Sequence, residues 1–127
     1  MIKPENLKPT GSELEILQIL WQKEKTTVRE VHEILSLTKK SGYTTTLKLM
    51  QIMFEKGLVT RDDSSKTHTY QPAVSRKKTQ KQFLDKMISG LFGGSSTQLV
   101  LQALGNHKAS KSELDEIQKY LDDLKNK

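Results

Sequence analysis

The fold of this 127-residue chain is constrained most by sequence signals that mark the starts of helices. After these signals, the spacing of the apolar residues changes once, from that of a helix to that of a strand. Thr10 is followed three residues later by Glu13, and the same pair of residue types recurs at Thr27 and Glu30. Each pair matches a capping box, in which a hydroxyl and a carboxylate satisfy free backbone amides at the start of a helix. Apolar residues follow each box at helical spacing. The chain is therefore predicted to begin with two short helices.

A third helix is predicted over residues 44–56. It follows a turn at residues 39–42, and Gly57 stands where a glycine commonly ends a helix. The apolar residues of this segment cover much of its circumference, so most of the helix is expected to pack against protein.

After Gly57 the period changes from helical to β. Residues 58–61 and 67–70 are rich in β-branched and aromatic side chains, and the polar residues 62–66 separate them. This is the pattern of a hairpin with a polar tip. Pro72 has no backbone N–H for pairing and should end the second strand. Three helices followed by a hairpin predict a winged helix-turn-helix domain over residues 1–74.

Three more helices are predicted in residues 75–127. The first begins at Ser75 and breaks at the glycines 93–94, a short one over residues 99–104 stops near Gly105, and the last follows a capping box of Ser110 and Glu113. About fifty residues bury too little surface to be stable alone, and the last helix has the narrow apolar seam that one helix presents to another. We therefore predict a mainly α chain whose second part is a helical dimerisation domain, with a monomeric fold-back onto the first domain as the alternative. The interface is expected to contain Phe83, Leu84, Met87, Leu91, Leu99, Leu114, Ile117, Leu121 and Leu124.

The excess of positive over negative charge lies in the middle of the chain. The net charge is −1 in residues 1–35, +6 in residues 36–80 and +1 in residues 81–127. A positive electrostatic field that is concentrated in one stretch of the chain favours a polyanionic partner. Double-stranded DNA is the expected partner because the third predicted helix combines this charge with a polar stripe. Attachment to an anionic membrane ranks last, since no basic amphipathic helix with inserted aromatic residues is present.

The polar stripe on the third helix has the residue types of a major-groove reader. We expect base contacts from Thr44, Thr45, Lys48 and Gln51, because lysine binds guanine, glutamine binds adenine and the threonine methyl contacts thymine. Phosphate contacts are expected from the residues that flank the helix and from the hairpin, namely Lys39, Lys40, Ser41, Tyr43, Arg61 and Lys66. The alternative function is a protein-interaction adaptor that uses the winged-helix surface without DNA.

Catalytic and metal-binding chemistry is not predicted. The chain has no cysteine, no nucleophile elbow and no P-loop, and its three histidines share no ligand spacing. We therefore expect no enzyme activity, no catalytic residue, no metal, no cofactor and no small-molecule substrate. The first residues contain no apolar segment typical of a secretory signal, so a cytoplasmic protein is expected.

Six short segments carry a family resemblance: residues 13–17 (ELEIL), 20–21 (LW), 43–45 (YTT), 55–59 (EKGLV), 70–75 (YQPAVS) and 91–95 (LFGGS). In this order and spacing the chain resembles the BlaI/MecI-type penicillinase repressor family over nearly its whole length. The resemblance implies a homodimeric winged-helix transcriptional repressor that binds a palindromic operator. It also implies release by proteolysis in the dimerisation domain, triggered by a membrane-bound metallopeptidase sensor.

The chain departs from that family at two places. The staphylococcal-type repressors are cut at an Asn-Phe bond after the short apolar helical segment, whereas this chain has Gln102 and Ala103 there. The resemblance therefore does not extend to the cleavage dipeptide. A copper-responsive branch carries a C-terminal cysteine cluster, and the absence of cysteine excludes that mode of sensing here.

Overall fold

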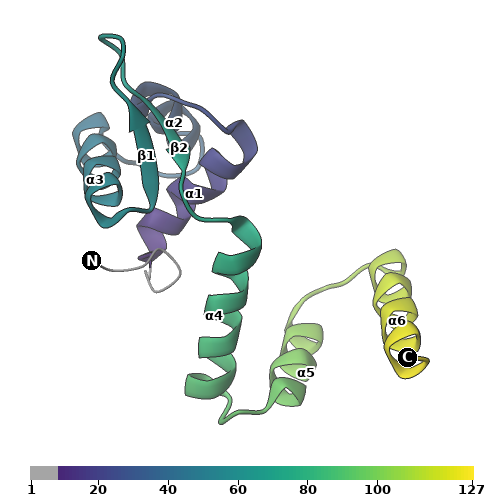
Figure 1. Cartoon of the computed structure of the whole chain (residues 1–127). Coiled ribbons are helices and arrows are strands. Elements are labelled where there is room, and N and C mark those ends of the chain that lie inside the picture. Colours follow the sequence, from purple (N-terminus) through teal and green to yellow (C-terminus); the bar gives the residue numbers. More distant parts are fainter. Residues whose placement is uncertain (1–8) are drawn as a thin grey trace. The chain divides into compact units, whose positions relative to one another are not determined.

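The computed structural model describes residues 9–127, which form six helices and a two-stranded antiparallel sheet (Figure 1). The chain divides into two units inside α4, where the first unit ends at Lys81 and the second begins at Gln82. The domain boundary expected between residues 74 and 75 stays a prediction. In chain order the elements are α1 (Gly11–Lys23), α2 (Val28–Leu35), α3 (Tyr43–Lys56), β1 (Val59–Asp62), β2 (Thr69–Pro72), α4 (Arg76–Leu91), α5 (Ser96–Asn106) and α6 (Lys111–Lys125).

Three helices begin at the capping boxes that the sequence predicts. At α1 the Thr10 hydroxyl accepts a hydrogen bond from the Glu13 N–H at 3.2 Å, and the Glu13 carboxylate accepts one from the Thr10 N–H at 2.8 Å. The same reciprocal pair begins α2 at Thr27 and α6 at Ser110. Each cap stabilises its helix by about 1 kcal/mol, because it satisfies amides that have no partner within the helix.

The third helix, α3, ends where the sequence predicts. Gly57 has a φ of 85°, in the left-handed region that glycine adopts without a steric penalty, and its N–H donates to the Phe54 carbonyl at 3.1 Å. The helix begins at Tyr43, one residue earlier than predicted, after Gly42 in the N-cap position.

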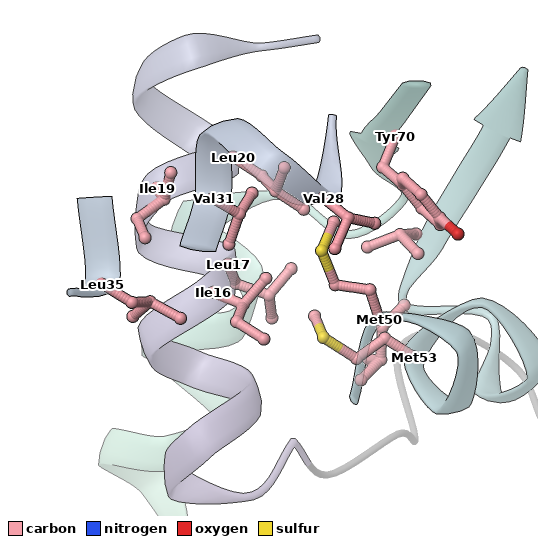
Figure 2. Close-up of a cluster of buried hydrophobic side chains, with 12 residues drawn as sticks. Ile16, Leu17, Ile19, Leu20, Val28, Val31, Leu35, Met50, Met53 and Tyr70 are labelled. Atoms are coloured by element: carbon pink, nitrogen blue, oxygen red, sulfur yellow. The ribbon is translucent and has the colours of Figure 1, made fainter. Parts of the chain in front are cut away.

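The core of the first unit lies between α1, α2, α3 and β2 (Figure 2). Leu17 of α1, Val31 of α2, and Met50 and Met53 of α3 are fully buried. Figure 2 shows the two methionine side chains pointing from α3 toward α1. Complete burial of one such side chain stabilises the fold by about 1.5–3 kcal/mol. This packing occupies one face of α3 and leaves the other in solvent.

The second strand of the hairpin begins and ends two residues later than the sequence predicts. Residues 67–70 are expected to pair with residues 58–61, but β1 and β2 pair in the register Val59 to Pro72 and Asp62 to Thr69. The cause is local hydrogen bonding at the tip, where Asp62 accepts from the Ser64 N–H at 2.9 Å and the Ser65 hydroxyl donates to the Thr67 carbonyl at 2.8 Å. These bonds favour turns over pairing. Pro72 is the last residue of β2, as expected.

A contact distant in sequence anchors the other edge of β2. The Tyr70 N–H donates to the Thr26 carbonyl at 2.7 Å, and the Thr26 N–H donates to the Tyr70 carbonyl at 3.1 Å. The loop between α1 and α2 therefore pairs with the hairpin on the side that β1 does not use. The base of the wing is held to the helical core by this bridge.

The second unit consists of the end of α4 with α5 and α6. Gly93 and Gly94 have φ values of 58° and 86° and separate α4 from α5, as predicted. The helix α5 runs from Ser96 to Asn106, so it begins three residues before the predicted residue 99 and ends one residue after Gly105, near the predicted end. The Ser95 hydroxyl accepts from the Gln98 N–H at 3.1 Å and starts the helix directly after the glycine turn. No residue of α5 or α6 is buried.

Candidate nucleic-acid interface

Polar side chains line the solvent face of α3. Thr44, Thr45, Lys48 and Gln51 are all exposed, as the sequence predicts for residues that contact bases. Positions 44, 48 and 51 are four and three residues apart, so they share one stripe of the helix. The stripe offers donors, acceptors and methyl groups of the kinds that bind base edges. That it contacts bases stays a prediction.

An ion pair joins the far end of α3 to the start of α1. The Lys56 ammonium lies 2.7 Å from the Glu13 carboxylate, whose side chain is only 2% exposed. Burial by itself raises the pKa of Glu13, but hydrogen bonds from Lys56 and from the Thr10 backbone outweigh it and hold this pKa below its ordinary value. The two helices are thereby tied across the core, which supports the orientation of the polar stripe.

The residues before α3 that were predicted to contact phosphate differ in whether they are already paired within the protein. Lys39 pairs with Glu15 at 3.1 Å, whereas Lys40 is exposed and Ser41 is half-buried. Tyr43 is 44% exposed, and its ring stands nearly perpendicular to that of His32 with the ring centroids 5.8 Å apart. Lys40 and Tyr43 therefore face solvent at the start of α3.

On the wing, Arg61 is engaged within the protein. Its guanidinium lies 4.2 Å from the centre of the Phe54 ring and its Nε lies 2.7 Å from an oxygen of Asp63. A hydrogen bond with Tyr70 and then Asp63 raise the pKa of Arg61 above its ordinary value. Arg61 consequently packs β1 against α3, an arrangement that sequence reasoning did not anticipate.

The acidic residues at the wing are also paired. The Asp62 carboxylate accepts a hydrogen bond from the Ser64 N–H, and the Lys25 ammonium lies 3.4 Å from the same carboxylate. Hydrogen bonds from Ser64, and to a smaller extent the contact with Lys25, lower the pKa of Asp62. Lys66, by contrast, is exposed and forms no ion pair with any residue from 9 to 127. It is the predicted wing cation that the fold leaves available.

A cleft of about 300 Å³ beside α3 was not foreseen from the sequence. The start of α2 contributes Thr27 and Arg29 to its walls, α3 contributes Tyr43, and the hairpin contributes Lys66 and His68. Arg29 carries one local signal, because it is a cation in the first turn of the helix that precedes the predicted recognition helix. Its neighbours in the cleft come from segments distant in sequence.

The residues predicted to form the dimer interface lie in solvent or are half-buried. Leu91 is 75% exposed, and six of the predicted residues are exposed to at least 42%, namely Leu84, Met87, Leu91, Leu114, Leu121 and Leu124. Phe83, Leu99 and Ile117 are half-buried. Val100, Leu101 and Tyr120 are exposed apolar residues that were not predicted for the interface.

The described part of the chain contains no group of three or more histidine, aspartate or glutamate side chains that could hold a metal ion. Within the same residues, no helix has both the length and the apolar character needed to cross a bilayer.

Comparison with known proteins decides the family. The penicillinase repressor family matches residues 9–123 of this chain. The chain belongs to this family. Members similar to it include the transcriptional regulator BlaI of Mycobacterium tuberculosis, 32% identical over 77 residues that cover 60% of this chain and 50% of that protein. The match thus spans half the length of the mycobacterial regulator.

A second family member is similar over a longer stretch. The methicillin resistance regulatory protein MecI of Staphylococcus aureus is 25% identical over 116 residues, which cover 88% of this chain and 91% of that protein. Among solved structures, the DNA-binding domain of the repressor BlaI matches 61% of this chain and 93% of that domain, with a TM-score of 0.52 and 20% identity. The predicted winged-helix fold and the predicted repressor family are both confirmed.

Proposed function

We propose that this penicillinase repressor family member is a sequence-specific transcriptional repressor that binds a palindromic DNA operator as a homodimer. The observation that carries the proposal is the exposed stripe of Thr44, Lys48 and Gln51 on α3, a helix whose other face is buried in a winged-helix unit. The names of its relatives, a transcriptional regulator and a resistance regulatory protein, support the same function.

The stripe can read bases by direct contact. In helix-turn-helix proteins the recognition helix lies in the major groove, and residues near its N-terminus contact base edges. Lys48 can bind guanine and Gln51 can bind adenine through two hydrogen bonds, while Thr44 and Thr45 can place a methyl group against thymine. The exposed Lys40, Tyr43 and Lys66 flank the stripe and suit contacts to phosphate.

Dimerisation is supported by the apolar surface of the second unit. Leu114, Ile117, Leu121 and Leu124 are spaced three, four and three residues apart on α6, and three of the four are exposed in the single chain. A second copy related by a two-fold axis would bury this seam. It would also place two recognition helices at half-sites one helical turn, or a multiple of it, apart.

Release of the operator by proteolysis forms the last part of the proposal. No residue of α5 or α6 is buried, and a cut between these helices would separate α6 from the rest of the chain. A membrane-bound metallopeptidase sensor is the partner that the family resemblance implies. Loss of α6 would remove the apolar seam and with it the dimer.

A binding titration tests the function directly. We expect the protein to bind the DNA upstream of its own coding sequence more tightly than a scrambled duplex of equal length and composition. The logarithm of the binding constant should fall linearly with the logarithm of salt between about 50 and about 200 mM, with a slope of roughly −0.9 per phosphate contact. Equal binding to both duplexes, or binding that ignores salt, would contradict the proposal and favour the protein-interaction adaptor.

A further inference from the structure

The cleft beside α3 is lined by cationic and hydroxyl-bearing side chains from three segments of the first unit, together with the apolar Val28 and Leu47. Arg29 comes from the first turn of α2, Tyr43 from the first turn of α3, and Lys66, Thr67 and His68 from the hairpin. No aspartate or glutamate lines it. A concave site of this composition favours an oxyanion, because opposite charge and hydrogen-bond donors converge there.

The carboxylates nearest to these residues in sequence already have partners. Glu30, next to Arg29, accepts from the Thr27 N–H at 3.0 Å as part of the α2 cap. Asp63 lies 2.7 Å from Arg61 and 3.4 Å from His68. Neither Arg29 nor Lys66 forms an ion pair with any of residues 9–127, unlike Lys39 and Arg61. The two cations of the cleft therefore remain available to an anion from outside the protein.

The position of the cleft selects the anion. Tyr43 belongs to its wall and directly precedes Thr44, where the base-reading stripe of α3 begins. When a recognition helix lies in the major groove, the helix before it crosses the sugar-phosphate backbone. The start of α2 and the hairpin would then contact the backbone of the same DNA strand from two sides.

We propose that this cleft seats one phosphodiester group of the operator, held jointly by Arg29 from α2 and Lys66 from the wing. The inference rests on the proposed function and deepens it in two ways. It adds Arg29, which is not among the phosphate contacts predicted from the sequence, to those contacts. It also makes the wing and α2 contact a single phosphate. The contributions of Lys66 and Arg29 to the salt dependence of DNA binding are then not independent of each other.

The sharing gives a quantitative test. Operator binding is titrated with salt for the full-length protein and for Arg29→Ala, Lys66→Ala and the double variant. Each single variant should bind about tenfold more weakly, the loss typical of one charge-assisted hydrogen bond. The double variant should lower the salt slope by about 0.9, the value for one phosphate, whereas independent contacts would lower it by about 1.8. Arg29→Lys should recover part of the affinity because it keeps the charge but loses the planar fork.

Lys108→Ala is the matched control. It removes one positive charge from the connection between α5 and α6, outside the winged-helix unit, and should leave the slope unchanged. Circular dichroism checks that each variant folds, which is expected because Arg29, Lys66 and Lys108 are all exposed. If wild type binds the operator as proposed and Arg29→Ala keeps its full affinity, the cleft inference is refuted. If wild type shows no operator preference, the proposed function itself fails.

A second arm separates DNA phosphate from free phosphate. The thermal midpoint of wild type and of Arg29→Ala is compared in inorganic phosphate and in potassium chloride at equal ionic strength and pH. We expect no stabilisation specific to inorganic phosphate. A rise in midpoint that Arg29→Ala abolishes, together with an unchanged affinity for operator DNA in that variant, would show a site for a free anion and overturn the proposal.

Discussion

Removing the Lys56 ammonium should destabilise the first unit strongly, because it leaves a carboxylate without a cation in the core. Lys56 lies 2.7 Å from Glu13, whose side chain is 2% exposed, while the Lys56 side chain is 32% exposed. Breaking a buried pair by removing one partner costs about 3–5 kcal/mol. Since water screens part of Lys56, we expect Lys56→Met to lower the free energy of unfolding by about 3 kcal/mol, the lower end of that range.

The opposite substitution should cost less. Glu13→Gln keeps an acceptor for the Thr10 N–H, and the freed ammonium of Lys56 can turn toward solvent. We expect a loss of about 1.5 kcal/mol, as for one hydrogen bond to a charged group. The double variant should be more stable than Lys56→Met, because it no longer buries an unpaired charge. The order of the three variants thus separates a buried charge pair from simple packing.

Acid should erase these differences. The pKa of Glu13 is lowered in the folded protein, so its contribution is complete above the ordinary value of 4.5 and is lost as the pH falls through the lowered pKa. Urea unfolding at pH 7 and at a series of acidic pH values, followed by Trp21 fluorescence, measures this, since Trp21 is the only tryptophan and lies in the first unit. If Lys56→Met unfolds within about 0.5 kcal/mol of wild type at pH 7, the reasoning is refuted.

Three further changes have expected outcomes. Trp21→Phe removes the indole N–H that donates to the Val74 carbonyl at 2.9 Å, and urea unfolding followed by circular dichroism should show a loss of about 1 kcal/mol; no change would mean that this bond does not hold the start of α4. Leu121→Asp should convert the dimer to a monomer in sedimentation velocity, whereas Lys119→Asp, on the opposite side of α6, should not; a dimer that survives both would place the interface elsewhere. Lys48→Ala should reduce the preference for operator over scrambled DNA by about 1–3 kcal/mol, and an equal loss on both duplexes would make Lys48 a phosphate contact.

Features set by neighbours in sequence were predictable. The capping boxes at Thr10, Thr27 and Ser110 and the left-handed Gly57 each depend on groups at most four residues apart. The exposed stripe on α3 also follows from the sequence, because helical spacing alone separates its polar residues from Met50 and Met53. Where local hydrogen bonds compete with pairing, as at the wing tip, the bounds of the first strand were wrong by one residue and those of the second by two.

The tertiary fold decides whether each charged side chain has a partner within the protein. Arg61 and Lys66 look alike as basic residues of one hairpin, yet Arg61 packs on Phe54 beside Asp63 while Lys66 faces the cleft. Other ion pairs join residues that lie tens of positions apart, as Glu13 and Lys56 do, and no local pattern encodes such pairs. Periodicity and capping therefore specify which helices form and which face of α3 meets solvent. Only packing determines which cations are already neutralised, because an ion pair forms where the folded chain brings two charges together.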